Sequence, residues 1–353
     1  MNLILGRRKM TIAMKYVAAA TAVMLAGTTL PAQADDETTL KISHMFSLTH
    51  YAWTQAGAPF TQKVAELSGN KLQFQEYPAG QLGKDYISQL NSGLADVVVL
   101  VGSYTADKLP LTSVSELPVK YDSACEASGK LWSIIKPGGS LYEEEYKPQG
   151  LRPLFVALLP TYKIMTTTKA LKSYDEVKGL KIRASGAAME QTVRALGGVP
   201  VQIQGPEISD SLRRGTVDGT FLSYNSAHPY GVDAVVKHGI KGPSLGSTSV
   251  VFAMTERKWE SLTDDQRTAL ETAAMQVQPQ FCGWMDADED KARQRMIDEF
   301  GYAAVEVSNE ETTALQEKLL TVAEAWAERM EEQRKPGRAI LEAFQSASPE
   351  NVD

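Results

Sequence analysis

The chain has 353 residues, of which 43% are hydrophobic and 22% are charged, and its formal net charge is −7 at pH 7. This length and apolar content suffice for a core shared between two lobes, and they argue against a disordered or repeat-array protein. Acidic residues number 43 against 36 basic ones, and no long Lys/Arg run occurs in the body of the chain. The composition therefore argues against nucleic acid as a partner.

The first 34 residues differ in kind from the rest. Basic residues between Arg7 and Lys15 precede an apolar run over residues 16–30, and an A-x-A sequence ends at Ala34. This order predicts a secretory signal peptide over residues 1–34. A membrane anchor is the alternative, but a bilayer span needs roughly 20 apolar residues. Cleavage would leave a more acidic mature chain, of net charge −11, outside the cytoplasm and not embedded in a membrane.

The body of the chain begins with an order of elements that occurs twice. Patterns of strand, helix, strand, helix and strand follow one another from Leu40 to Val101, and the same order returns from Leu180 to Leu222. The second helix of each repeat ends in the same motif, Leu90-x-x-Gly93-x-x-Asp96 in the first and Leu212-x-x-Gly215-x-x-Asp218 in the second. The shared motif favours two similarly built α/β lobes. The alternative is that two unrelated segments end their helices with the same common sequence.

Beyond a strand pattern over residues 249–253, which we expect to cross back, the chain becomes strongly helical. One helix should start at Thr263 and kink at Pro279, and another should stop near Pro336. We assign residues 35–159 with 248–288 to lobe 1 and residues 160–247 with 289–353 to lobe 2. Ligands of parallel α/β sheets bind beyond the carboxyl ends of strands, so the cleft between the lobes is the expected site.

Several chemistries are poorly supported. The sequence Gly242-Pro243-Ser244-Leu245-Gly246 fits G-x-S-x-G, but a strand pattern follows where a nucleophile elbow needs a helix. There is no Walker A or dinucleotide fingerprint, and the four histidines and two cysteines show no zinc spacing, so we expect no cofactor, no metal and no enzyme activity. Cys125 and Cys282 could form a disulfide in an oxidising compartment or remain free thiols.

Arg183 is the strongest candidate site residue. It lies at the carboxyl end of the strand pattern that opens the second repeat, where the first repeat has Ser43. A guanidinium there would present a fixed fork of donors to a carboxylate, a sulfonate or a phosphate. A structural ion pair is the alternative.

The chain resembles the substrate-binding proteins of TRAP (tripartite ATP-independent periplasmic) transporters, the DctP family. The resemblance rests on Tyr77-Pro78-Ala79-Gly80-Gln81-Leu82-Gly83, Gly93-Leu94-Ala95-Asp96, Gly179-Leu180-Lys181-Ile182-Arg183, Ala195-Leu196-Gly197-Gly198 and Gly215-Thr216-Val217-Asp218-Gly219, in this order. It implies a two-lobed periplasmic-binding-protein-like fold of type II. It also implies a receptor in the periplasm that closes over an organic anion and delivers it to the transporter's membrane subunits, with Arg183 pairing with the substrate carboxylate.

Two departures from the family pattern matter for the site. Tyr162-Lys163 stands where many members have a second arginine, so Lys163 would supply a single point-charge contact. Directly after Gly219, where the family often has Glu-Asn, this chain has Thr220-Phe221, and Ser223 or Asn225 could replace the usual asparagine contact. Aromatic residues after the first lobe's strands either pack in the scaffold or cover an apolar ligand body. The candidate ligand-binding residues are Arg183, Lys163, Tyr162, Ser223, Asn225, Tyr104, Phe46, His44 and Trp53, with His50 and Tyr51 among the covering aromatics.

The sequence thus predicts a monomeric receptor for a small organic carboxylate. An aromatic body is one option for this acid, and a sulfonate is the next choice. An extracytoplasmic enzyme on the same scaffold and a sensory ligand-binding protein are the alternatives. The first would need a catalytic constellation, and the second would differ only in its membrane partner.

Overall fold

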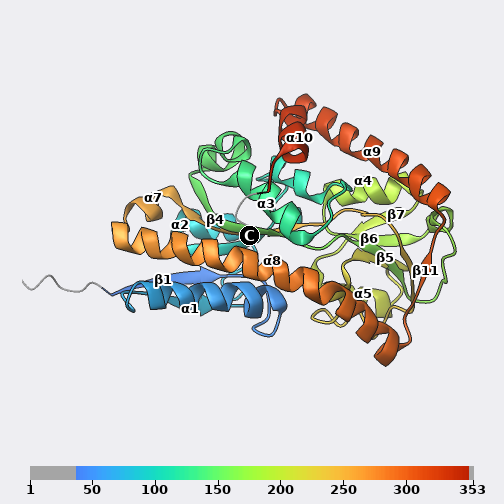
Figure 1. Ribbon diagram of the computed structural model, residues 1–353, viewed down its shortest axis with the longest axis horizontal. Coiled ribbons are helices and arrows are strands. Elements are labelled where there is room, and N and C mark those ends of the chain that lie inside the picture. Colours follow the sequence, from blue (N-terminus) through green and yellow to red (C-terminus); the bar gives the residue numbers. More distant parts are fainter. Residues whose placement is uncertain (1–36, 350–353) are drawn as a thin grey trace, which may run out of the picture. The chain divides into compact units, whose positions relative to one another are not determined.

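The computed structural model describes residues 37–349 of the protein. The predicted signal peptide lies outside the described residues. Within residues 37–349, no helix combines the length and the apolar character that a membrane span requires. The strands of this part form two sheets, of five and six strands (Figure 1).

The first sheet contains the strands of the first repeat. Its order is β2 (Leu72–Tyr77), β1 (Thr38–Ser43), β3 (Val97–Val101), β10 (Ser249–Thr255) and β4 (Leu151–Leu158). The strand β1 pairs in parallel with β2 and β3, whereas β10 is antiparallel to β3 and β4. The expectation that β10 crosses back is therefore confirmed.

The second sheet contains the strands of the second repeat. Its order is β11 (Ala303–Glu306), β9 (His238–Lys241), β5 (Lys163–Thr166), β8 (Gly219–Leu222), β6 (Lys181–Ala184) and β7 (Val199–Gln202). The strand β6 pairs in parallel with β7 and β8, and β5 is antiparallel to β8 and β9. The neighbours β2-β1-β3 thus correspond to β7-β6-β8, each followed by an antiparallel strand. At the far edge of the second sheet, β11 forms a further parallel pair with β9.

The turn that follows the second helix has the same backbone conformation and the same hydrogen bond in both repeats. Gly93 and Gly215 adopt left-handed backbone conformations, with φ of 73° and 67°, which a glycine adopts without steric cost. In the first repeat the Asp96 carboxylate accepts a hydrogen bond from the Lys41 backbone N–H at 2.8 Å, and in the second the Asp218 carboxylate accepts one from Lys181 at 2.8 Å. The matching geometry confirms the predicted repeat.

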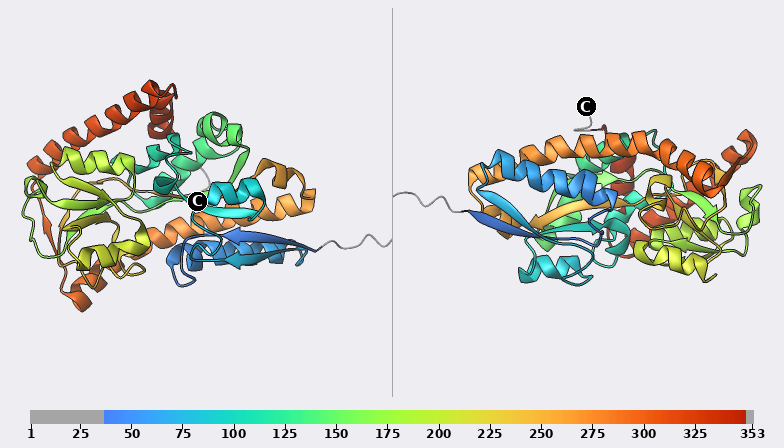
Figure 2. Two further views of the ribbon diagram at one scale, coloured as in Figure 1. Left: turned by 180° about the vertical axis from the view of Figure 1, so that it is seen from behind. Right: turned by 90° about the horizontal axis from the view of Figure 1, so that it is seen from below.

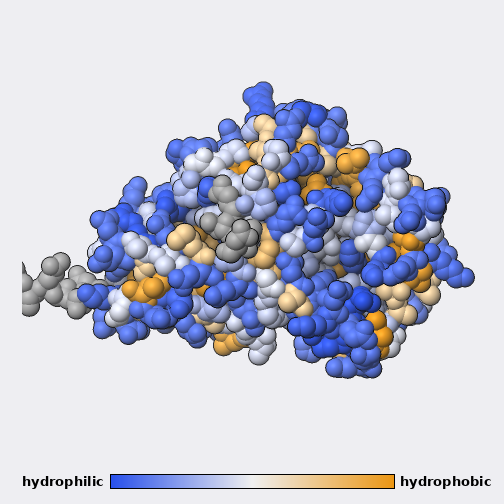
Figure 3. All heavy atoms as spheres, viewed as in Figure 1, coloured by the Kyte–Doolittle hydropathy of each residue, from blue (hydrophilic) through white to orange (hydrophobic). Residues whose placement is uncertain are grey.

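The helices cover both sheets (Figure 2). They are α1 (Ala58–Leu67), α2 (Tyr86–Ser92), α3 (Ala124–Ile135), α4 (Ala187–Ala195), α5 (Ile208–Arg213), α6 (Tyr224–Ala227), α7 (Glu256–Glu260), α8 (Asp264–Phe300), α9 (Asn309–Glu332) and α10 (Gly337–Ser346). On the face in Figure 3 the surface is mostly hydrophilic, with small separate hydrophobic patches.

The longest helix, α8, connects the two halves of the described chain. It starts at the predicted place, where the Thr263 hydroxyl accepts from the Gln266 N–H and the Gln266 side chain accepts from the Thr263 N–H. It continues through Pro279 and packs against α1, α3 and β4 on the first sheet and against α6 beside the second. The predicted lobe boundary at residue 288 falls inside this helix, and the boundaries stay a prediction.

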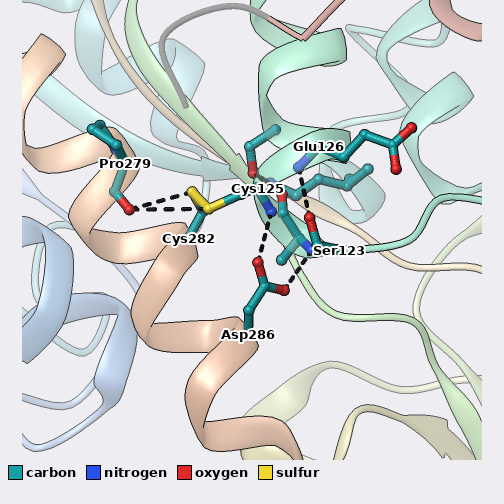
Figure 4. The surroundings of a disulfide bond; sticks show 9 residues. Ser123, Cys125, Glu126, Pro279, Cys282 and Asp286 are labelled. Carbon is teal, nitrogen blue, oxygen red and sulfur yellow. Dashed lines mark hydrogen bonds between the residues drawn. A yellow bond between two sulfur atoms is a disulfide. The ribbon is translucent and has the colours of Figure 1, made fainter. Parts of the chain in front are cut away.

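Cys125 and Cys282 form a disulfide that joins α3 to α8 (Figure 4). Their Cα atoms are 4.8 Å apart. One turn further along α8, the Asp286 carboxylate accepts hydrogen bonds from the backbone N–H groups of Ala124 and Cys125 at 2.6 and 3.2 Å. A negative charge at a helix N-terminus satisfies donors that have no partner within the helix. The covalent bond and the cap therefore fix the start of α3 on α8.

We expect removal of the disulfide to lower the free energy of unfolding. The two cysteines are 157 residues apart in sequence, so their bond strongly restricts the unfolded chain, and the loss should be about 2–5 kcal/mol. Urea unfolding of the Cys125→Ser/Cys282→Ser protein beside the oxidised wild type measures it. The reduced wild type is the control, and equal midpoints for oxidised and reduced wild type would contradict the expectation.

Candidate functional site

Arg183 is held inside the protein by carbonyl groups of its own sheet. It lies on β6 and is 1% exposed. Its Nε donates to the Ile203 carbonyl at 2.8 Å, and its NH1 donates to the Phe221 carbonyl at 3.2 Å. The second terminal nitrogen donates to the Tyr104 hydroxyl at 3.2 Å. A guanidinium has five N–H groups, so two remain beyond these three bonds.

Tyr104 links this arginine to the first sheet. It ends a short 3₁₀ turn, η2 (Gly102–Tyr104), that follows β3 directly. Its hydroxyl also accepts a hydrogen bond from the Gly205 backbone N–H, at 2.8 Å. Residues that follow the first sheet and residues of the second sheet therefore meet at Arg183.

A small cavity of about 20 Å³ lies at this meeting point. This volume holds about one water molecule. Of the predicted site residues, the cavity is lined by Arg183, Tyr162, Tyr104 and Phe46. The remaining lining residues are His50, Tyr51, Ala52, Val101, Leu159, Leu222, Ser226, Tyr230, Thr248 and Val250.

Aromatic rings form one wall of the cavity. The His50 ring centroid lies 4.6 Å from that of Phe46, 4.6 Å from that of Tyr51 and 4.9 Å from that of Tyr230. Phe46, His50 and Tyr51 follow β1, whereas Tyr230 follows α6 in the other half of the chain. Flat rings from both halves thus face the space beside Arg183.

Four predicted residues lie behind this wall rather than on it. The rings of His44 and Trp53 stack at 4.1 Å between centroids, and His44 lies 6.3 Å from Phe46. The Ser223 hydroxyl contacts the Ser226 hydroxyl at 2.7 Å and donates to the Asn225 side-chain oxygen at 2.9 Å. Ser226 in turn bonds the Tyr51 hydroxyl at 2.8 Å. These residues support cavity side chains and do not line the cavity themselves.

The structure does not bring Lys163 to Arg183. Its ammonium donates to the Gly242 carbonyl at 2.7 Å, and its side chain lines a different groove, beside Lys120 and Leu319. Neighbouring residues of an extended chain point to opposite sides, so the side chain of Tyr162 reaches the cavity and that of Lys163 does not. The expected second cationic contact is therefore not formed here.

Several lining residues were not singled out from the sequence. Val101 and Leu222 end β3 and β8, and Leu159 follows β4. Their position at strand ends is a signal that could have identified them, because ligands gather at such ends. Tyr230 and Ser226 follow no such pattern, since only the packing of the two halves brings them to the cavity.

A buried glutamate lies close to the site. Glu116, which ends the 3₁₀ segment η3 (Leu111–Glu116), is fully buried, and neither carboxyl oxygen has a hydrogen-bond partner among residues 37–349. A Cβ placed on Gly186, at the start of α4, would lie 2.7 Å from its Oε2. Burial raises the pKa of Glu116 to about 8, against the opposing effect of Arg329 and Arg183. The carboxyl group is thus mostly protonated at neutral pH.

The two histidines nearest the cavity are also uncharged at neutral pH. Burial lowers the pKa of His44 to about 4 and that of His50 to about 3. Arginine keeps its charge in proteins. Arg183 therefore provides positive charge beside a wall of neutral aromatic rings, which is an arrangement suited to an anion with an apolar body.

Catalytic and metal chemistry find little support in the described part of the chain. Within residues 37–349, no group of three or more His, Cys, Asp and Glu residues is placed to hold a metal ion. The Ser244 hydroxyl accepts a bond from the Gly246 N–H at 3.2 Å, and the strand β10 follows it. This is not the geometry of a nucleophile elbow.

A family model described as bacterial extracellular solute-binding protein, family 7 (DctP), matches residues 42–332. A curated relative, the C4-dicarboxylate-binding periplasmic protein DctP of Rhodobacter capsulatus, is 29% identical over 190 residues. That alignment covers 54% of this chain and 55% of the relative, so the chain spans about half the length of that protein.

Solved structures with the same fold include two TRAP solute-binding proteins. One, from Rhodoferax ferrireducens T118, was solved with copurified benzoate; it is 23% identical, with a TM-score of 0.78, over 88% of this chain and 97% of that one. The other, from a marine metagenome and specific for aromatic acids, was solved with 3-hydroxybenzoate; it is 22% identical, with a TM-score of 0.80, over 88% and 97%. They confirm the predicted fold class.

We expect Glu116→Gln to change how stability depends on pH. Between the pKa of about 4.5 in the unfolded chain and about 8 in the folded protein, only the folded state keeps the proton, so the free energy of unfolding of the wild type falls as pH rises. The glutamine variant lacks this decline. Relative to wild type it should gain about 3–4 kcal/mol between pH 5 and pH 8.

Urea unfolding of both proteins at pH 5, 6.5 and 8 measures the difference. Glu144→Gln is the control, because it makes the same chemical change at an exposed glutamate. A Glu116→Gln protein whose stability runs parallel to that of wild type across this pH range would contradict the prediction.

Proposed function

The chain belongs to the bacterial extracellular solute-binding proteins of family 7, the DctP family, and from this membership and its site we propose that it captures a small organic carboxylate with Arg183. The observation that carries the proposal is the buried guanidinium with two uncommitted N–H groups beside an aromatic-lined cavity. Two N–H donors match in number the two oxygens of a carboxylate.

We further propose that the acid has an aromatic body. The rings of Phe46, His50 and Tyr230 offer flat apolar surface next to Arg183. The two solved relatives described above were determined with benzoate and 3-hydroxybenzoate, which supports this class. A sulfonate is the next candidate, since its three oxygens suit a planar fork less well than two do.

Binding requires the two halves of the site to separate first. Small-molecule pockets usually measure roughly 300–1,000 Å³, and the cavity of about 20 Å³ is far smaller. The bonds from Tyr104 to Arg183 and from Tyr51 to Ser226 join the halves across it. Opening would break them, and closure over a ligand would enclose it between lobe 1 and lobe 2 by a hinge motion.

The rest of the proposed function concerns location and partners. We propose that residues 1–34 direct the chain to the periplasm, where the mature protein works as a monomer and delivers its ligand to the membrane subunits of a TRAP transporter. The protein would then return the acid unchanged. Turnover of the bound acid during incubation with purified protein would instead favour an enzyme.

We expect substitution of Arg183 to weaken binding of every acid that the wild type binds. Arg183→Lys keeps a charge but loses the planar fork, and Arg183→Gln loses the charge. Hydrogen bonds to charged groups contribute about 1.5–3 kcal/mol each, so the affinity should fall about tenfold or more for Lys and about a hundredfold for Gln. Calorimetric titration with benzoate, its hydroxylated forms and benzenesulfonate measures this.

Arg214→Gln is the matched control, because Arg214 is exposed on the same half of the chain and its loss changes the net charge equally. Circular dichroism shows whether each variant is folded. Affinity of a folded Arg183→Gln protein within threefold of wild type would overturn Arg183 as the anchor.

A further inference from the structure

His50 occupies a central place in the cavity that the carboxylate role of Arg183 leaves unexplained. Its side chain is buried, 3% exposed, and lies among the rings of Phe46, Tyr51 and Tyr230. It follows β1, so it belongs to the first half of the site, whereas Arg183 belongs to the second. Both line the same cavity.

The hydrogen bonding of His50 fixes which ring nitrogen carries the proton. The Ala52 backbone N–H donates to Nδ1 at 3.1 Å, so Nδ1 presents a lone pair and bears no hydrogen. Burial lowers the pKa of His50 to about 3, which leaves the ring neutral at physiological pH. A neutral imidazole has one N–H, and that hydrogen is therefore on Nε2.

The Nε2–H group is a donor without a partner. Its nitrogen is buried and forms no hydrogen bond with any group among residues 37–349. Buried polar groups in folded proteins are nearly always hydrogen-bonded. An unpaired donor in the wall of a binding cavity therefore indicates an acceptor supplied by the ligand.

The count of donors indicates which part of the ligand this acceptor is. Arg183 has two N–H groups left, and a carboxylate has two oxygens for them. The His50 donor comes from the opposite half of the site, where the aromatic wall faces the ligand body. It is thus placed for an oxygen on that body.

We propose that His50 is a specificity-determining residue that donates a hydrogen bond from Nε2 to a second oxygen of the ligand, so that the receptor selects aromatic acids with a hydroxyl or carbonyl group over unsubstituted ones. This inference rests on the proposed function, since it assumes that Arg183 holds the carboxylate. It also gives the ligand a polar contact with each half of the site.

The first test uses the wild-type protein and ligands matched in size. Benzoate, the three methylbenzoates and the three hydroxybenzoates are titrated calorimetrically. A methyl group fills about the space of a hydroxyl group but accepts no hydrogen bond. We expect at least one hydroxybenzoate to bind about fivefold or more tightly than the methylbenzoate with the same substitution pattern. No such preference at any ring position would overturn the proposal.

The second test removes and restores the donor. His50→Phe keeps a flat ring against Phe46 and Tyr230 but has no N–H, and the Gln side chain in His50→Gln places an amide N–H at about the reach of Nε2. For the preferred hydroxybenzoate, we expect about a fivefold to tenfold loss in His50→Phe, from the net value of one neutral hydrogen bond, and recovery of most of it in His50→Gln. Benzoate, which has no oxygen outside its carboxylate, should lose clearly less affinity in His50→Phe than the preferred hydroxybenzoate does.

The outcomes separate this inference from the function on which it rests. An equal loss for benzoate and hydroxybenzoate in His50→Phe would place the contact on the carboxylate and overturn the second acceptor, while leaving the receptor function intact. Failure of wild type to bind any of these acids would overturn the proposed aromatic-acid function and this inference with it. If His50→Phe does not fold, the wild-type ligand series decides alone.

Discussion

The site depends on a cation buried inside the second sheet. Taking a guanidinium out of water is costly unless its donors find partners. Here the Ile203 and Phe221 carbonyls, which follow or lie on the strands beside β6, accept two of its hydrogen bonds. These bonds hold the planar group in one orientation without neutralising it. Arg183 therefore keeps its positive charge and its remaining donors available where the two halves of the chain meet.

The two repeats share a backbone framework but carry different side chains at the corresponding strand end. The bonds between Asp96 and Lys41 and between Asp218 and Lys181 close the two repeats in the same way. The strand that follows each lysine is thus similarly placed in both sheets, with Ser43 in one and Arg183 in the other. One framework presents a hydroxyl and the other a guanidinium. The functional difference between the halves comes from side chains, because their backbones are built alike.

Local patterns predicted the repeat, the strand ends and the start of α8. Glycine turns, capping residues and the alternation of apolar and polar residues all act over a few neighbouring residues, so the sequence shows them directly. Side-chain direction was harder. Tyr162 and Lys163 were both expected at the site, and only the first reaches it. The stop near Pro336 is confirmed, because α9 ends at Glu332, but the helix α10 that begins directly afterwards at Gly337 was not expected. Tyr230 and the pairing of Cys125 with Cys282 depend on contacts between distant segments, which no local pattern encodes.

An acidic chain that binds an anion poses an electrostatic problem that burial resolves. The whole chain has net charge −7, and such a charge acts on encounter and solubility through screened solvent. The electrostatic potential inside the cavity depends mainly on the charged groups close to it. Burial keeps Glu116, His44 and His50 uncharged at neutral pH, so the Arg183 charge is not cancelled at short range.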